Sequence, residues 1–264
     1  MASLEFTGGT RKTILEEMIK SQRLSIFLSC VCMLLLLVAC GPQKNDPSRF
    51  DSPSHGTINI SVDESFKPVM EEQIAMYETS YPGTNIIAHY KPEAECLRDL
   101  FTDTSNRAVI ITRGLTEKEE KFLRDSLKYI PGWNAVATDA IAVVVNSASY
   151  DTLFTLNRLE QQLKGKINRN QQIVFDGLNA TSTVRFVVDS VLKGAAFDTS
   201  VVKAARTSNE VLEYVATNKN AIGLVGINWI GNPEVPEQVK MLEKVKIAYL
   251  ECMVCEDTPY VKPM

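Results

Sequence analysis

The sequence predicts an α/β protein in which short buried strands alternate with amphipathic helices. Strand-length apolar runs recur along the chain, and most of them are followed by apolar side chains at helical spacing. Short apolar strands separated by helices are typical of a parallel sheet with right-handed crossover connections. A chain of 264 residues is also long enough to divide into two lobes.

The first half of the chain predicts three successive strand–helix units. Each strand is short, and each following helix places apolar residues on one face. The third helix opens with Thr-x-x-Glu, which is the pattern of a capping box. The predicted strands are residues 57–62, 84–90 and 108–112, and the predicted helices are residues 64–81, 93–102 and 116–128.

The second half opens with residues 140–145 (AIAVVV), the most continuously apolar strand after residue 40. An uninterrupted apolar run predicts a central strand. The helix predicted over residues 155–165 ends at a glycine. The remaining predicted elements are strands over residues 172–175, 221–225 and 246–250, a helix that begins near Thr181, and a helix over residues 208–218.

An uncharged run over residues 24–39 follows Lys20 and Arg23 and precedes Cys40. The run is shorter than the about 20 residues of a membrane span, so residues 1–39 are predicted to be a signal peptide. A small residue before cysteine is typical of a lipoprotein-processing site. We therefore expect a lipid on Cys40 to anchor the mature chain in the cell envelope, on the periplasmic or extracellular face of a bacterial membrane. An uncleaved anchor helix is the alternative.

The segment after Cys40 has almost no apolar residues to bury. Residues 40–55 are rich in Pro, Ser, Asp and Asn, which predicts a flexible tether with the folded part starting near Gly56. The net charge is −4 and no basic cluster is present, so the composition argues against nucleic-acid binding.

The sequence offers little support for catalysis. It has two histidines, His55 and His89, and no Gly-x-Ser-x-Gly elbow, zinc motif, P-loop or dinucleotide fingerprint. We predict no catalytic residue, no metal and no cofactor, and a hydrolase that uses His89 is the less favoured alternative. Asp63 and Glu64 could hold a metal, but a solvated acidic pair at a helix start is the favoured interpretation.

Cysteines are few once the leader is set aside. Cys252-Met-Val-Cys255 has the spacing of a redox or metal pair, but no second pair and no nearby histidine completes a zinc set. Buried free thiols or an incidental disulfide are favoured over a working redox or metal site.

At three places a predicted strand is followed by hydroxyl-bearing residues in the first turn of a predicted helix. In open α/β sheets ligands bind at the carboxyl ends of strands, where helix N-termini present free N–H groups. A micromolar anion site needs about 8 kcal/mol, and one charge-assisted hydrogen bond contributes about 1.5–3 kcal/mol, so several loops must converge. Ordinary helix caps are the alternative. The candidate ligand-binding residues are Ser65, Phe66, Thr112, Arg113, Thr181, Ser182 and Thr183.

Seven segments, in the same order along the chain, resemble the phosphate-binding lipoproteins of ABC phosphate transporters. Residues 155–167 carry the pattern TL-x-x-L-x-x-x-x-x-G-K-I, and residues 220–229 carry A-I-G-x-V-G. The other five segments are residues 60–73 (ISVDESFKPVMEEQ), 90–100 (YKPEAECLRDL), 109–119 (VIITRGLTEKE), 138–146 (TDAIAVVVN) and 175–186 (FDGLNATSTVRF).

The resemblance implies a two-lobed periplasmic-binding-protein fold of type II, with mixed sheets, flanking helices and a ligand cleft between the lobes. It implies that the first lobe comprises residues 56–139 and 240–264, and the second lobe residues 140–239. It also implies that the protein captures inorganic phosphate or a related oxyanion and delivers it to ABC permease subunits. An oxyanion-sensing or adhesion lipoprotein without transport is the alternative.

The resemblance also assigns roles to individual residues. Ser65 and Phe66 match the first phosphate loop, in which a hydroxyl and a backbone N–H would donate to the anion. The run from Thr181 to Thr183 matches the family's Ser-Gly-Thr turn, with Ser182 in place of the glycine. Gly177 stands where the family usually has an arginine.

A third departure lies after the third strand, where Thr112 and Arg113 replace an aspartate that some members use to accept the phosphate proton. This change leaves open whether phosphate or another tetrahedral anion, such as sulfate, is bound. We hypothesise that Arg113 supplies the missing positive charge from the opposite lobe, as a bidentate partner of two oxygens. A surface ion pair between Arg113 and Glu117 is the alternative.

Overall fold

The computed structural model describes residues 51–129, 132–177, 181–252 and 260–262, together with Met18, Lys20 and Cys255. The described residues from Asp51 onward form one compact unit. The predicted lipidation site, Cys40, lies outside the described residues. The same holds for most of the tether and for the predicted signal peptide, of which only Met18 and Lys20 are described. Among the helices that the structure describes, none combines the length and the apolar character that crossing a bilayer requires.

The folded unit begins a few residues before Gly56. Asp51 accepts a hydrogen bond from Arg107 (Oδ2···N 2.8 Å), and Ser52 forms an isolated bridge with His55. His55 is already the first residue of strand β1. Residues 51–55, which were predicted to be the end of the tether, are therefore part of the fold.

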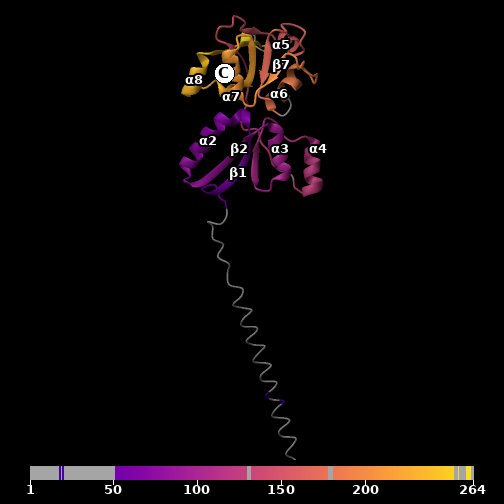
Figure 1. Ribbon diagram of the computed structural model, residues 1–264. Helices are drawn as coiled ribbons and strands as arrows, with labels where there is room; N and C mark the ends of the chain where they lie inside the picture. Colours follow the sequence, from indigo (N-terminus) through magenta and orange to yellow (C-terminus); the bar gives the residue numbers. More distant parts are fainter. Residues whose placement is uncertain are drawn as a thin grey trace, which may run out of the picture. The chain divides into compact units, whose positions relative to one another are not determined.

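A three-stranded parallel sheet in the order β2-β1-β3 defines the first lobe. Its labelled elements carry the indigo to magenta colours in Figure 1. All three predicted strand–helix units are present. The elements are β1 (His55–Asp63), η2 (Glu64–Phe66), α2 (Lys67–Ser80), β2 (Gly83–Lys91), α3 (Glu93–Thr102), β3 (Asn106–Ile110), α4 (Glu117–Phe122) and the π-helical turn η3 (Leu123–Leu127).

A five-stranded mixed sheet in the order β7-β6-β8-β4-β9 defines the second lobe. Strand β6 is parallel to β7 and β8, whereas β4 is antiparallel to β8 and β9. The elements up to β8 are β4 (Ile141–Asn146), β5 (Leu153–Phe154), α5 (Leu156–Leu163), β6 (Gln172–Phe175), α6 (Ser182–Phe186), η4 (Val187–Val191), β7 (Val202–Ala204), α7 (Ser208–Thr217) and β8 (Ala221–Gly226).

The C-terminal part of the chain pairs differently from our expectation. Residues 240–264 were predicted to return to the first lobe, but β9 pairs with β4, and β10 pairs with β5. The predicted single strand over residues 246–250 is split at Ala248, whose N–H donates to the carbonyl of Val143. The remaining elements are η5 (Ile227–Trp229), α8 (Pro236–Leu242), β9 (Val245–Ile247), β10 (Tyr249–Glu251) and β11 (Tyr260–Val261).

The second lobe contains two hydrophobic clusters, both of which include residues of β4 and β8. Because neighbouring residues of a strand point to opposite faces, Val143 and Val144 contribute to different clusters. Helix α5 packs into the first cluster through Leu159 and Leu163. The chain then turns at Gly165, whose φ of +64° is the left-handed conformation expected after a helix.

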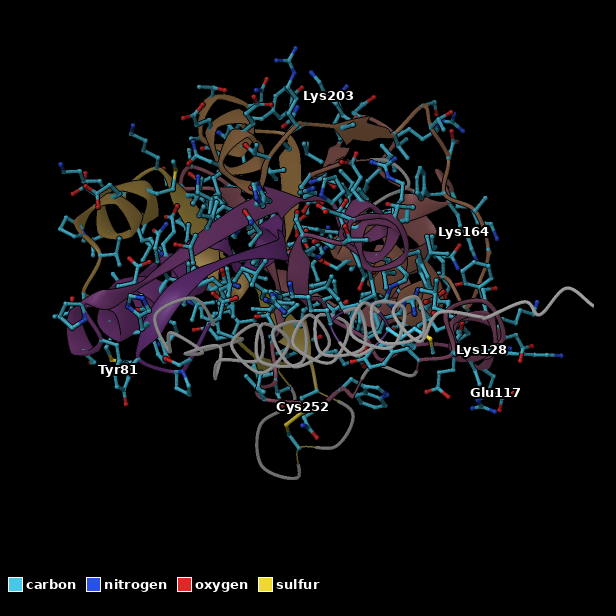
Figure 2. All side chains as sticks on the ribbon, turned by 90° about the horizontal axis from the view of Figure 1, so that it is seen from below. Tyr81, Glu117, Lys128, Lys164, Lys203 and Cys252 are labelled. Atoms are coloured by element: carbon cyan, nitrogen blue, oxygen red, sulfur yellow. A yellow bond between two sulfur atoms is a disulfide. The ribbon has the colours of Figure 1, made fainter. Side chains whose placement is uncertain are left out.

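A disulfide joins Cys252 and Cys255, and it appears as the yellow bond at the labelled Cys252 in Figure 2. This is the disulfide alternative of the sequence-based prediction. Cys96 is a buried free thiol in α3, and burial raises its pKa to about 12, so it remains protonated at neutral pH.

Gly223 of β8 lies where the sheet and α7 approach each other closely. A Cβ atom built at this position would lie 2.7 Å from Val144 and 2.9 Å from Val211 and Val215. We predict that Gly223→Ala lowers the free energy of unfolding by about 1–3 kcal/mol, because the added methyl group overpacks a buried contact. Chemical denaturation measures the change.

Gly132→Ala is the matched control, because a Cβ atom there would meet nothing within 4 Å. We expect it to change the free energy of unfolding by less than about 0.5 kcal/mol. Equal effects of the two substitutions would contradict the close packing of α7 on β8.

Candidate functional site

The first candidate loop lies at the carboxyl end of β1, the middle strand of its sheet. Asp63 ends the strand and caps η2, and its Oδ1 accepts hydrogen bonds from the backbone N–H (3.1 Å) and the hydroxyl (2.9 Å) of Ser65. Both residues are buried. Phe66 follows as the residue before α2. The cap therefore fixes the position of the Ser65 hydroxyl at the end of the strand.

The second candidate loop follows β6 in the other lobe. Thr181 precedes α6, and its hydroxyl accepts a hydrogen bond from the N–H of Val184 (3.3 Å). Thr183 donates to Oδ2 of Asp176, the residue directly after β6 (3.3 Å). Thr181, Ser182 and Thr183 are all buried. Thr181 therefore acts as a helix cap, and Ser182 and Thr183 contribute further hydroxyls at the same strand end.

The two loops meet, although they are 117 residues apart in the sequence. The hydroxyl oxygens of Ser65 and Ser182 lie 2.8 Å from each other, which is hydrogen-bonding distance. This contact joins the first lobe to the second. The structure thus brings together candidate residues that the sequence placed on separate strands.

Thr112 takes part in a different contact between the lobes. Its hydroxyl donates to Oε1 of Glu93 (2.6 Å) and accepts from a guanidinium nitrogen of Arg185 (2.5 Å). Arg185 also forms an ion pair with Glu93, with Nε 2.7 Å from Oε2. Glu93 is 3% exposed, whereas the side chain of Arg185 is 33% exposed, so it is the carboxylate end of the pair that is shielded from water. The hydrogen bonds of Thr112 are therefore already used within this cluster.

Arg113 forms a bidentate ion pair with Glu119, with both nitrogen–oxygen distances equal to 2.8 Å. Glu119 also accepts from the backbone N–H of Thr116 (2.7 Å), which completes the predicted capping box. The capping box directs the carboxylate of Glu119 back toward Arg113, and this explains why the partner is Glu119 rather than Glu117, the partner in the alternative interpretation. The structure thus shows Arg113 in an ion pair within the first lobe.

The interpretation of Asp63 and Glu64 as a solvated pair is wrong. Asp63 is 1% exposed and Glu64 is half-buried. Asp176 is a third carboxyl group in this region, and it too is buried. Within the described ranges no group of three or more ligating side chains is arranged to hold a metal ion.

These three carboxyl groups have raised pKa values. Burial raises the pKa of Glu64 to about 7. Hydrogen bonds from Ser208 act to lower this pKa, and the nearby charges of Asp176 and Asp63 act to raise it. Burial likewise raises the pKa of Asp176 to about 6 and raises that of Asp63. The lobe boundary therefore contains one acid, Glu64, that is about half protonated near neutral pH, and a second, Asp176, that becomes protonated in mildly acidic solution.

Glu64 forms a second link across the same boundary. Its carboxyl oxygens accept from the hydroxyl (2.9 Å) and the backbone N–H (3.3 Å) of Ser208, the first residue of α7. Sequence reasoning missed Ser208, Arg185 and Glu93 as groups that join the lobes. A signal was available for Ser208, because it opens a predicted helix as Ser182 does, but no sequence pattern indicates which lobe its partner belongs to.

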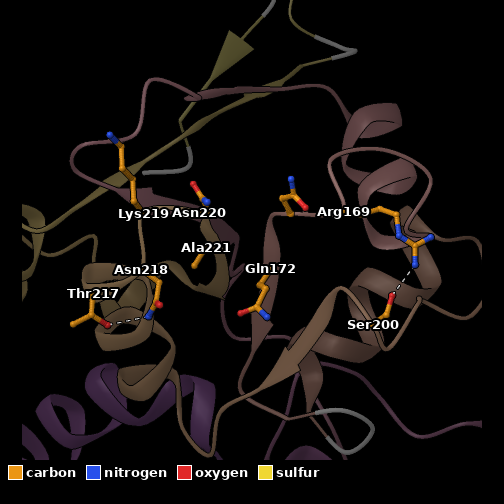
Figure 3. Close-up of a pocket in the computed structure, with 9 residues that line it drawn as sticks. Arg169, Gln172, Ser200, Thr217, Asn218, Lys219, Asn220 and Ala221 are labelled. Atoms are coloured by element: carbon orange, nitrogen blue, oxygen red, sulfur yellow. Dashed lines mark hydrogen bonds between the residues drawn. The ribbon is translucent and has the colours of Figure 1, made fainter.

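Figure 3 shows a polar pocket elsewhere in the second lobe. Gln172 and Ala221, the first residues of β6 and β8, contribute to its lining. The candidate loop around Asp176 follows the last residue of β6, so the pocket and the loop lie at opposite ends of that strand. Within this pocket the guanidinium group of Arg169 donates a hydrogen bond to the hydroxyl of Ser200 (3.2 Å).

A family model described as a PBP superfamily domain matches residues 48–257. The chain belongs to the PBP superfamily. The match includes both lobes, and it confirms the fold class predicted from the resemblance to phosphate-binding lipoproteins. No curated protein matches the chain in a direct sequence comparison.

Several solved structures share this fold at low sequence identity. A putative phosphate ABC transporter substrate-binding protein from Clostridium perfringens, solved with bound phosphate, has a TM-score of 0.58 and 17% identity over 74% of this chain and 76% of its own. An ABC-type phosphate transport receptor from Vibrio cholerae has a TM-score of 0.50 and 18% identity, covering 78% and 79% of the two chains. The CcmR regulatory domain of Synechocystis PCC6803, in complex with 2-PG, has a TM-score of 0.51 and 8% identity, covering 78% and 83%.

The ion pair between Arg113 and Glu119 predicts a pH-dependent contribution to stability. The Arg113 guanidinium lowers the pKa of Glu119 to about 2. The ion pair therefore contributes its full amount to the free energy of unfolding when the pH is above about 4.5, the ordinary pKa of a glutamate, and this contribution is lost as the pH falls toward 2. We predict that Glu119→Gln lowers the free energy of unfolding at neutral pH by about 1 kcal/mol, since glutamine keeps the capping box but loses the ion pair.

Denaturant titration at neutral and acidic pH tests this prediction, with Glu117→Gln as the control because Glu117 is exposed. The difference between wild type and Glu119→Gln is expected to shrink in acid. A larger loss of stability in Glu117→Gln would favour the alternative pairing of Arg113 with Glu117.

Proposed function

We propose that this protein is an extracytoplasmic, lipid-anchored solute-binding protein that captures inorganic phosphate between its lobes and delivers it to an ABC importer. The observation that carries the proposal is the contact between Ser65 and Ser182, which joins hydroxyl-bearing loops from the two lobes. Thr183 adds a third buried hydroxyl on the same loop as Ser182. Lipid anchoring through Cys40 rests on the sequence pattern before that cysteine.

Anion binding at this place requires the lobes to move. The 2.8 Å separation between the two hydroxyl oxygens leaves no space for a tetrahedral anion between them. Opening would expose both loops, and closing around phosphate would replace one protein–protein hydrogen bond with several bonds to the anion. Exclusion of water by the closed lobes would strengthen each of these bonds.

The buried acids explain how the site tolerates an anion without the arginine that the resemblance leads us to expect at Gly177. A charged carboxylate beside phosphate would be repulsive, but Glu64, with a pKa of about 7, is about half protonated at neutral pH, and Asp176, with a pKa of about 6, becomes protonated in mildly acidic solution. A neutral carboxyl group can also donate a hydrogen bond to a phosphate oxygen. Protonation therefore reduces the repulsion and adds donors.

Sensing without transport is a second candidate function. The observation that favours it is the similar fold of the CcmR regulatory domain, since a closing pair of lobes serves a sensor as well as a transporter. Genes for a permease and an ATPase beside the gene for this protein would favour transport.

Calorimetric titration of the protein with phosphate tests the proposed site. We predict that Ser65→Ala and Thr183→Val each weaken phosphate binding by about tenfold or more, because each removes a buried donor. Ser80→Ala, which changes an exposed serine at the end of α2, is expected to bind like the wild type. Sulfate and molybdate titrations establish which tetrahedral anion is preferred.

Phosphate binding that is unchanged in both Ser65→Ala and Thr183→Val would place the anion elsewhere. The absence of phosphate binding by a folded wild-type protein would contradict the proposed ligand.

A further inference from the structure

The acidic side chain of Glu64 is bound to the start of a helix in the other lobe. The two residues of this contact, Glu64 and Ser208, are 144 positions apart, and Ser208 is fully buried. Helix α7 is ten residues long and begins at Ser208, so its first N–H groups need hydrogen-bond acceptors, which the oxygens of the Glu64 carboxyl group supply. Glu64 thus satisfies a buried hydroxyl and a backbone N–H that would otherwise need another partner.

Both ends of this contact are tied to the candidate site. Glu64 directly precedes Ser65 in the three-residue turn η2, so a shift of one residue moves the other. On the opposite side, Oδ2 of Asp176 lies 3.5 Å from the hydroxyl of Ser208 and accepts a hydrogen bond from Thr183. A chain of contacts therefore runs from Glu64 to the loop that carries the candidate ligand residues of the second lobe.

We propose that Glu64 is a positioning residue that holds the Ser65 loop against Ser182 by binding the start of α7, and thereby closes the lobes when no solute is bound. The inference rests on the proposed function only in taking this contact region as the solute site. Because a solute can enter only when the lobes separate, the bond between Glu64 and Ser208 must break before the solute binds. Glu64 therefore sets the balance between open and closed lobes.

The charges around Glu64 make this balance depend on pH. Asp63 and Asp176 face Glu64, and Glu210 lies in the first turn of α7. When the lobes are closed, burial and the two aspartates raise the pKa of Glu64 to about 7, whereas a solvated Glu64 in open lobes has its ordinary value of about 4.5. The closed state therefore holds the proton more tightly, and closure weakens as the pH rises through about 7.

Pulsed electron paramagnetic resonance on the full chain in detergent tests the proposal without any solute. Spin labels are attached through non-natural amino acids at Glu72 of α2 and at Thr199 of the second lobe, both of which are exposed. The wild type is expected to show mainly the short label distance at about pH 6, and its open fraction should rise by about tenfold at about pH 8.5. Circular dichroism confirms that each variant is folded.

Variants of Glu64 and Ser208 distinguish the effect of the Glu64 charge on lobe closure from the effect of the hydrogen bonds between the two residues. Glu64→Ala is expected to open the lobes at both pH values, whereas Glu64→Gln, which keeps an acceptor without a charge, should stay closed at both. Ser208→Ala changes the second lobe alone and should give an intermediate open fraction. Glu210→Ala is the control, since Glu210 accepts its hydrogen bond from Arg206 within its own lobe.

Label distances in Glu64→Ala that match the wild type would overturn the proposal. A pH response that persists in Glu64→Gln would assign the titration to Asp63 or Asp176 and overturn the role of the Glu64 charge. Phosphate titration of the same samples separates the two proposals. Lobes that respond as expected in a protein that does not bind phosphate would overturn the proposed ligand and leave the positioning role intact.

Discussion

Polar groups buried where the two lobes meet require hydrogen-bond partners, and several of them find these partners in the opposite lobe, whereas Oδ2 of Asp63 and Oδ1 of Asp176 have none. A buried hydroxyl or carboxyl group without a partner costs about 1–3 kcal/mol. Three contacts meet the requirement: Ser65 with Ser182, Glu64 with Ser208, and Arg185 with Glu93 and Thr112. If one of these contacts is replaced by solute, the other two decide how far the lobes must separate.

The three contacts differ in the chemistry that controls them. The serine pair is neutral and is replaced most readily by an oxyanion, because hydroxyl groups can rotate to donate. The bond between Glu64 and Ser208 depends on the protonation state of an acid that burial has made easier to protonate. The ion pair between Arg185 and Glu93 depends on desolvation, since removal of one partner leaves a buried charge. Solute, pH and packing therefore act on different contacts along one boundary.

Periodicity was sufficient to predict the order of the main strands and helices, because buried strands such as β4 and β8 are continuously apolar. It missed β7 and predicted one C-terminal strand where the structure has β9 and β10, since three-residue strands carry no periodic signal. The sequence also placed residues 240–264 in the first lobe on the strength of the family resemblance, whereas β9 pairs with β4. Local pattern cannot identify the partner of a strand when that partner is about 100 residues away in the sequence.

The candidate site was predicted in part. Hydroxyl residues at strand ends led to Ser65 and Ser182, which the structure places in contact. Arg113 was predicted to bind the anion, with a surface ion pair to Glu117 as the alternative, whereas the capping box turns Glu119 toward its guanidinium. Asp63 and Glu64 were taken as solvated because acids at a helix start usually are, and their burial follows from contacts with the second lobe that sequence cannot show.

A crystal structure of the protein grown with phosphate tests the central claim most directly, because it shows where the anion binds. The account predicts one phosphate between the lobes, with hydrogen bonds from Ser65, Ser182 and Thr183 in place of the direct bond between the two serines. Phosphate bound at another surface, with Ser65 and Ser182 still bonded to each other, would contradict it.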